Sequence, residues 1–272
     1  MTNIEKIEDS IQRICAIIAT ITNMVLLHLI INKSPKKFGA YKYLMIYISV
    51  FEIIYAIDDV IIMPKLFTHG STYLILVDSE NTILPQWIIP FLTLFYVGAF
   101  GMAMVIFAVH FIFRYLVVTG NIRWTTKSTS KLLIWILVPL IYGLFFTAFC
   151  KIFMGRNEIM DAYIKLVFTE VSTIQDQTIY RNSSSGYFHI NIQKEYHFGF
   201  YFYPTNSKGV KVVNWWNITG VFLATLTLLI SSIVMFFFGY KCYRAVKSLT
   251  LQSSQVSGKY RTLQTQLFYA LV

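Results

Sequence analysis

The sequence is poor in charge. Only 13% of its 272 residues are Asp, Glu, Lys or Arg, whereas 56% are hydrophobic and 17% are aromatic. Water-soluble domains carry about a quarter of their residues as charges, so this composition excludes an ordinary soluble globular protein. The few charges are also unbalanced, with 23 basic residues against 13 acidic ones.

Cysteine is scarce as well, which excludes a disulfide-rich scaffold. Cys15, Cys150 and Cys242 lie in or beside different apolar segments and lack metal-ligand spacing. We expect Cys15 and Cys150 to be separate buried thiols, with a disulfide between them as the alternative. The sequence also shows no phosphate-binding glycine loop, catalytic triad or nucleotide motif, so we predict neither an enzyme, nor a metal site, nor a cofactor.

The apolar residues are gathered in blocks of about 20 or more, the length at which a helix crosses a hydrocarbon core of roughly 30 Å. We therefore predict an all-α, polytopic transmembrane bundle in a single domain, 1–272, with five full spans and part of a sixth. Gly98 and Gly101 are expected at close helix contacts. The approximate spans are 11–31, 41–63, 88–118, 132–153, 213–240 and 263–272 (partial), with a long loop at 154–212.

Basic residues cluster in the turns after the first, third and fifth spans, where acidic residues are missing. Lys and Arg mark cytoplasmic loops, so the pattern predicts an extracellular N-terminus and an extracellular loop at 154–212. In that loop Asn182 begins an Asn-Ser-Ser glycosylation acceptor. Because the basic residues are divided among short turns, they indicate topology in a lipid bilayer rather than a nucleic-acid partner.

Three stretches in this order, Asn32–Tyr55, His110–Tyr115 and Leu263–Val272, resemble the nematode Str-type chemoreceptors, a branch of the seven-transmembrane G-protein-coupled receptors. The resemblance implies a rhodopsin-like bundle that binds an odorant or other small chemical and activates a heterotrimeric G protein. It also implies the plasma membrane, in the sensory cilium of chemosensory neurons. In the family two helices are completed after the position of Leu263, so the resemblance implies a chain truncated within its sixth helix.

The same resemblance assigns Arg114 the role of the arginine that ends the third helix and faces the G protein, together with Tyr115 and His110. Phe113 stands where rhodopsin-like receptors usually have an acidic partner for that arginine. The alternative for Arg114 is an interfacial arginine whose charge reaches the headgroups. The alternatives for His110 are simple packing and a hydrogen-bonded relay toward Arg114.

The outer half of the second and third spans supplies candidate ligand-pocket residues, namely Asp59, Tyr96 and Phe100. Glu52 is an intramembrane acid, expected to be protonated or ion-paired because charge inside hydrocarbon is costly. For Asp58 and Asp59 the alternative is that both only reach the outer headgroups.

Two other functions remain open from the sequence. In a transporter or channel subunit, Glu52 and Asp59 would line a polar path, although internal repeats typical of that class are not found. A truncated, non-signalling receptor product is the other alternative. The sequence favours a chemosensory G-protein-coupled receptor over both.

Overall fold

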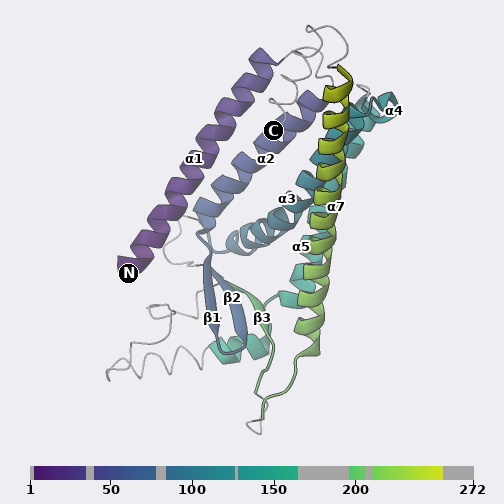
Figure 1. Ribbon diagram of the computed structural model, residues 1–272. Helices are drawn as coiled ribbons and strands as arrows, with labels where there is room; N and C mark the ends of the chain where they lie inside the picture. The colour runs from purple at the N-terminus through teal and green to yellow at the C-terminus, as the bar shows by residue number, and fades with distance from the viewer. Residues whose placement is uncertain are drawn as a thin grey trace.

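The computed structural model describes residues 3–34, 40–77, 84–125, 128–164, 196–205 and 210–253. The predictions for Asn182 and for the partial span 263–272 lie outside these residues. Long helices make up most of the described chain, as Figure 1 shows, so the expectation of a mostly helical protein is confirmed. The helices are α1 (Asn3–Lys33), α2 (Tyr41–Ile62), α3 (Ile89–Val118), the short α4 (Ile122–Thr125), α5 (Thr129–Met154) and α7 (Trp215–Ser253).

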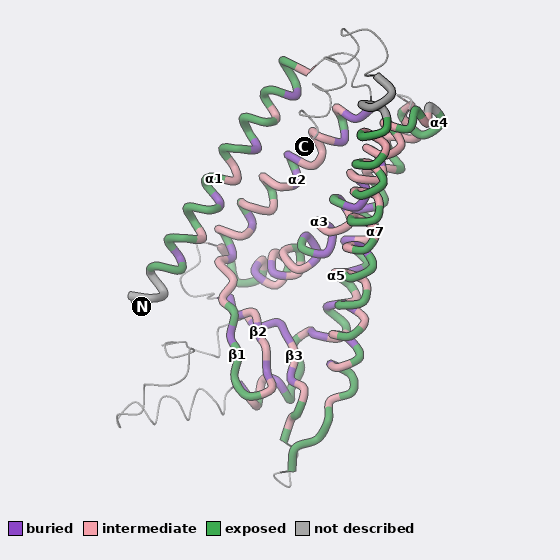
Figure 2. Tube along the Cα trace, in the orientation of Figure 1, coloured by how far each residue is buried: buried purple, intermediate pink, exposed green. Residues whose placement is uncertain are grey.

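Within the described residues, four helical segments are long and apolar enough to cross a membrane: Ile7–Lys33, Ile89–Val118, Thr129–Met154 and Trp215–Ser248. Helix α2 is also 22 residues long, but it carries Glu52, Asp58 and Asp59 within its apolar sequence. These acids set α2 apart from the four others. Much of α1, α5 and α7 is exposed (Figure 2), and many of the exposed residues are large and apolar. This suits helices surrounded by lipid, because hydrocarbon does not penalise apolar surface.

Helix α3 lies at the centre of the bundle and packs against α2, α5 and α7. Half of its most apolar 18-residue window is buried, against 17% for α1 and α5. Its glycines allow this close approach, as expected from the sequence. A Cβ atom on Gly98 would collide with Thr147 of α5, and one on Gly101 would overlap the ring of Phe146.

Helix α2 ends at a local backbone signal. Its C-cap residue Met63 has a φ of 45°, in the left-handed region, and Pro64 follows it. Because proline lacks a backbone N–H, it cannot continue the helix hydrogen bonds. The chain then turns into β1 (Lys65–His69), and Gly70, with a φ of 58°, begins the turn into β2 (Thr72–Val77).

The strands form a three-stranded antiparallel sheet of order β1-β2-β3, completed by β3 (Tyr196–Tyr201) from a distant part of the chain. Lys65 pairs with Leu76 in the first ladder, and Leu74 pairs with Gly199 in the second. Gly199 is required there because a Cβ atom would collide with the carbonyl oxygen of Tyr73. The sheet and the N-terminal part of α1 lie at the same end of the bundle (Figure 1), where Lys65 pairs with Asp9 at 4.0 Å.

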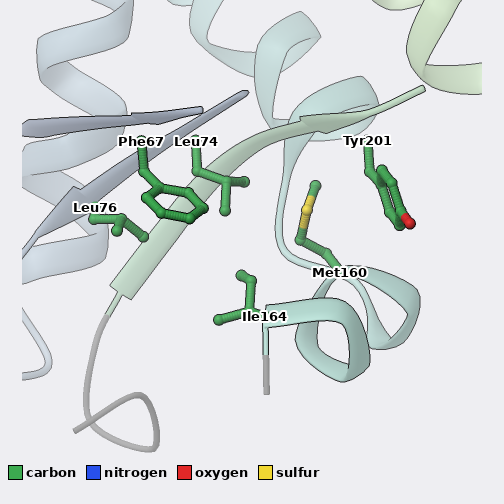
Figure 3. Packing of buried hydrophobic residues seen from close by; sticks show 6 residues of the cluster. All are labelled: Phe67, Leu74, Leu76, Met160, Ile164 and Tyr201. Carbon is green, nitrogen blue, oxygen red and sulfur yellow. The ribbon is translucent and has the colours of Figure 1, made fainter. Parts of the chain in front are cut away.

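Both faces of the sheet are covered. One face packs onto helical residues 158–164, and Figure 3 shows the shared cluster of Phe67, Leu74, Leu76, Met160, Ile164 and Tyr201. The opposite face packs onto the helices: Phe198 lies in a cluster with Phe146 and Cys150 of α5. Val77 and Tyr196 pack with Ile62 of α2 and Tyr96 of α3. The sheet therefore closes this end of the bundle.

The all-α prediction is wrong at this end of the molecule. Residues 154–212 are not simply a loop, because they include the helical residues 158–164 and strand β3. The turn predicted after the second span is a β-hairpin. The error arose because each strand is short and pairs with a partner that the hydropathy pattern does not reveal, since β2 and β3 are more than 100 residues apart.

Candidate functional site

Two polar clusters lie between α2 and α3. The first, here called the Arg114 cluster, consists of Tyr41, His110, Phe113 and Arg114. The Nε–H of Arg114 donates a hydrogen bond to the Tyr41 hydroxyl at 2.9 Å, and that hydroxyl lies 3.3 Å from Nε2 of His110. The Tyr41 hydroxyl can accept from Arg114 and also share a hydrogen bond with Nε2 of His110, because a hydroxyl has one proton and two lone pairs. Tyr41 thus joins both α3 residues to the first turn of α2.

His110 contacts Tyr41 rather than Arg114 directly. His110 and Arg114 are one turn apart on the same face of α3, and both contact the ring or hydroxyl of Tyr41. The imidazole Nδ1 is buried and has no hydrogen-bond partner among the described residues. The two residues are therefore linked indirectly, through Tyr41, rather than by a direct hydrogen bond.

Phe113 occupies the position at which rhodopsin-like receptors usually have an acidic residue. In this protein its ring packs between helices. It is 1% exposed, stacks on Tyr41 with ring centroids 5.9 Å apart, and meets Trp135 of α5 edge to face at 5.4 Å. An acid at this position would place a charge in an apolar cluster with Leu44 and Val109. The hydroxyl of Tyr41 serves Arg114 instead, as a neutral hydrogen-bond acceptor.

Tyr115 belongs to a different contact. Its ring meets Phe238 of α7 at 5.7 Å in an edge arrangement, and Nζ of Lys241 lies 5.7 Å from the Tyr115 ring centroid. Tyr115 is thus directed toward α7, while Arg114 is directed toward α2. The consecutive residues Arg114 and Tyr115 tie the end of α3 to two neighbouring helices.

The second cluster, here called the Asp58 cluster, consists of Asp58, Asp59, Tyr55 and Tyr96 near the sheet end. The Tyr55 and Tyr96 rings have centroids 5.5 Å apart and are tilted by 37° relative to each other. Both carboxylates lie within electrostatic range of the two tyrosine hydroxyls. Asp58 is only 4% exposed, and neither of its oxygens has a hydrogen-bond partner among the described residues.

The candidate pocket residues from the sequence are only partly brought together. Asp59 and Tyr96 lie in the Asp58 cluster, and the backbone carbonyl of Asp59 accepts a hydrogen bond from Gln12 of α1 at 3.3 Å. Phe100 is 50% exposed on the surface of α3. Glu52 is half-buried on α2 and forms no ion pair within the described part of the chain.

Asp58 and Asp59 are not equivalent, although they are adjacent. The sequence left open that both merely reach the lipid headgroups. The burial of Asp58 contradicts that alternative for this residue. Asp58 belongs to the stripe of α2 whose residues Phe51 and Ile62 pack against α3. Asp59 is half-buried.

The sheet end holds a third polar group, outside the long helices. Arg156 Nε donates to both carboxylate oxygens of Asp161 at 3.0 Å, and Nε2 of the buried His197 lies 2.8 Å from Asp161 Oδ1. Burial lowers the pKa of His197, and Arg156 adds to this effect while Asp161 opposes it. His197 thus resists protonation next to the strand pairing that holds β3.

The described residues contain no group of three or more His, Cys, Asp or Glu side chains that could hold a metal ion. The three cysteines are free thiols. Cys150 is buried, as expected, but Cys15 is exposed on α1, so the expectation of a buried thiol is wrong there. The physical reason is that α1 packs mainly against α2 and leaves its other faces open.

Sequence reasoning did not find Tyr41, Tyr55 or the special position of Asp58. Tyr41 is 73 residues from Arg114, and nothing in its local sequence distinguishes it from the neighbouring Tyr43 and Tyr47. A signal did exist for Asp58, because it shares a helix face with Tyr55 and Ile62 at spacings of three and four residues. That spacing indicates burial against α3.

Comparison with known proteins gives a consistent result. Residues 8–272 match the family model described as serpentine type 7TM GPCR chemoreceptor Str. The chain is 29% identical over 268 residues to G-protein coupled receptor str-217 of Caenorhabditis elegans, covering 97% of this chain and 72% of that protein. It is 27% identical over 252 residues to serpentine receptor class r-10 of the same species, covering 92% and 67%. No solved structure matches the chain.

Proposed function

The chain belongs to the Str family of serpentine seven-transmembrane chemoreceptors, and from this premise we propose that it is a chemosensory receptor that detects a small molecule and activates a heterotrimeric G protein. The observation that supports this proposal best is the hydrogen-bonded junction of Arg114, Tyr41 and His110, which joins α2 to α3 at one end of the bundle. The hydrogen bonds of such a junction can be either formed or broken, which would give the receptor two distinct arrangements of α2 and α3.

The proposed topology places the N-terminus outside the cell in the plasma membrane of a sensory cilium, with α2 as a fifth span. The Arg114 end is then cytoplasmic, where Lys33, Arg123 and the C-terminal part of α7 with Lys241, Arg244 and Lys247 also lie. The sheet end is extracellular and covers the outer part of the bundle. Asn182 would be an extracellular glycosylation site in this arrangement.

The proposed mechanism uses the fact that both polar clusters bridge the same two helices. Tyr55 and Tyr41 are 14 positions apart on α2, which corresponds to about 21 Å along a helix. A ligand in the outer cluster would favour one arrangement of α2 relative to α3. The Tyr41–Arg114 hydrogen bond at the inner end would be kept in one arrangement and lost in the other, which would expose Arg114 to the G protein.

A cell assay tests this proposal. The chain, carrying a surface tag, is expressed in cells with a G-protein activation reporter and exposed to a broad panel of volatile and water-soluble chemicals. We expect at least one chemical to give a response, and we expect Arg114→Ala to remove it at unchanged surface level. Lys151→Ala is the matched control, because Lys151 is an exposed cation at the opposite end of the bundle.

Two results would count against the proposal. A chain that reaches the surface and responds to none of the chemicals would argue against a signalling receptor. A response that survives Arg114→Ala but is lost in Lys151→Ala would remove the assigned role of the Arg114 cluster.

A further inference from the structure

The Asp58 cluster contains a buried acid whose charge the described part of the protein does not balance. Asp58 is 4% exposed, neither oxygen accepts a hydrogen bond, and no Lys, Arg or His side chain of the described residues pairs with it. The basic residues close to the end of α2 are engaged elsewhere. Lys65 pairs with Asp9 at 4.0 Å, and Arg13 donates to the sulfur of Met63 at 3.6 Å.

A buried carboxylate of this kind is costly unless something neutralises it, and a proton or a cation can do so. The second acid of the cluster favours the cation. Asp59 follows Asp58 directly on α2 and is half-buried, so a second acid lies next to the buried, unpartnered one. A cation beside Asp58 would be attracted to its carboxylate and, at longer range, to that of Asp59.

The side chains around the acids indicate which cation fits. Tyr55 lies on the same face of α2 as Asp58, three residues earlier. Its ring packs against that of Tyr96 with centroids 5.5 Å apart and stacks on Phe51 with centroids 6.1 Å apart. Aromatic rings attract organic ammonium groups through their faces, whereas a small metal ion prefers several oxygen ligands. The cluster thus pairs carboxylates with aromatic surface, the combination that recognises an organic amine.

The sheet closes this site from the outer end. Val77 of β2 and Tyr196 of β3 pack with Ile62 and Tyr96, directly beyond the Asp58 cluster. A ligand there would be shielded from water, which strengthens its attraction to the acids.

We propose that the Asp58 cluster is the site of a small organic amine in its protonated form, with Asp58 as the counter-ion and Tyr55 and Tyr96 as aromatic walls. This inference rests on the proposed receptor function and specifies the chemical class of the ligand. It gives the structural reason why a carboxylate stays in the interface of α2 and α3.

Thermal unfolding of the full chain in detergent micelles tests the site without any signalling step. The probes are benzylamine, phenethylamine and isoamylamine, each compared with its alcohol counterpart, benzyl alcohol, 2-phenylethanol or isoamyl alcohol. Benzyltrimethylammonium serves as a permanent cation. We expect a saturating amine to raise the unfolding midpoint by about 5 °C and its alcohol counterpart to leave the midpoint nearly unchanged.

Two variants make the test specific. Asp58→Asn keeps the size of the side chain and removes its charge, so we expect it to abolish the amine-dependent shift. Glu52→Gln removes another acid of the same helix, outside the cluster, and should keep the shift. A circular dichroism spectrum confirms that each variant is folded.

Each remaining outcome overturns the inference. Amines that stabilise the chain no more than their alcohols, or an amine shift that persists in Asp58→Asn, would show that Asp58 is not their counter-ion. A shift produced by sodium chloride alone, and lost in Asp58→Asn, would assign the site to an inorganic cation. Failure of the receptor function is distinguishable, because amine binding without a reporter response would contradict only signalling, and a response to neutral chemicals alone would contradict only the amine site.

Discussion

The Arg114 cluster and the Asp58 cluster lie between the same two helices. They differ in whether the charged side chain has a partner within the protein. Arg114 donates to Tyr41 at 2.9 Å, and Tyr41 in turn lies within hydrogen-bond distance of His110. Asp58 is buried, and neither of its carboxylate oxygens has a hydrogen-bond partner among the described residues. In the Arg114 cluster the charged group has a hydrogen-bond partner within the protein, whereas the buried acid of the Asp58 cluster lacks a positive partner within the described residues.

This difference indicates different roles for the two ends of α2 and α3. A satisfied network holds neighbouring elements in one arrangement, because breaking it leaves polar groups unpaired. An unsatisfied buried acid lowers the stability of the unliganded protein and can be stabilised by a ligand. We therefore expect substitutions in the Arg114 cluster to lower stability and removal of the Asp58 charge to raise it.

The largest effect should come from Phe113→Ala, which removes the ring that Tyr41 and Trp135 pack against. We expect a loss of about 3 kcal/mol, at the low end for buried phenylalanine, because lipid reduces the transfer part of the free energy while the cavity remains. Thermal unfolding in detergent micelles measures it. Phe107→Ala is the control, since Phe107 is 41% exposed on the same helix. Equal losses in both variants would mean that Phe113 has no special packing role.

A smaller loss is expected for Tyr41→Phe, which keeps the ring and removes the hydroxyl shared by Arg114 and His110. A hydrogen bond to a charged group contributes about 1.5 kcal/mol or more, and we expect the lower value because Arg114 is partly exposed. Unfolding measurements give the stability, and the cell reporter should show increased basal activity if the junction restrains α2. Tyr243→Phe is a suitable control, because Tyr243 is 56% exposed. A stability equal to wild type would argue against the Tyr41 junction.

In contrast to these losses, we expect Asp58→Asn to increase stability in the absence of any amine. Removing an uncompensated buried charge should raise the free energy of unfolding by about 1 kcal/mol, because the amide has a smaller desolvation cost than the carboxylate. A variant less stable than wild type would contradict the view that the charge of Asp58 lowers the stability of the protein. The same unfolding assay, run at neutral pH without added amine, measures the change.

The smallest effect concerns the sheet that covers the Asp58 cluster. Burial lowers the pKa of His197 below its unfolded value of about 6.5. The unfolded chain therefore binds more protons at mildly acidic pH, and stability is lost as the pH falls from that unfolded value toward the lower folded one. We expect the unfolding midpoint of the wild type to fall between about pH 6.5 and pH 5. His197→Gln should reduce this dependence, and an unchanged pH profile would contradict the prediction.

Much of the helical framework could be predicted from the sequence, because hydrophobic blocks long enough to cross a bilayer leave few alternatives to a helix. The structure has long helices where these blocks lie, and α2 ends immediately before Met63 and Pro64. The sheet could not be predicted in the same way. Strand β2 finds one partner across a tight turn at Gly70, but its other partner, β3, lies far along the chain.

The candidate sites, like the fold, have features that could be predicted from the sequence and features that depend on packing. Residue identity and helical periodicity were enough to place Arg114 near the end of a long apolar helix and to place acids within α2. Only the tertiary structure decided that Tyr41 is the partner of Arg114, that Phe113 packs where an acid was expected, and that Asp58 is the buried acid of the pair. Periodicity fixes which residues share a helix face, whereas the neighbour that this face meets depends on how the helices pack together.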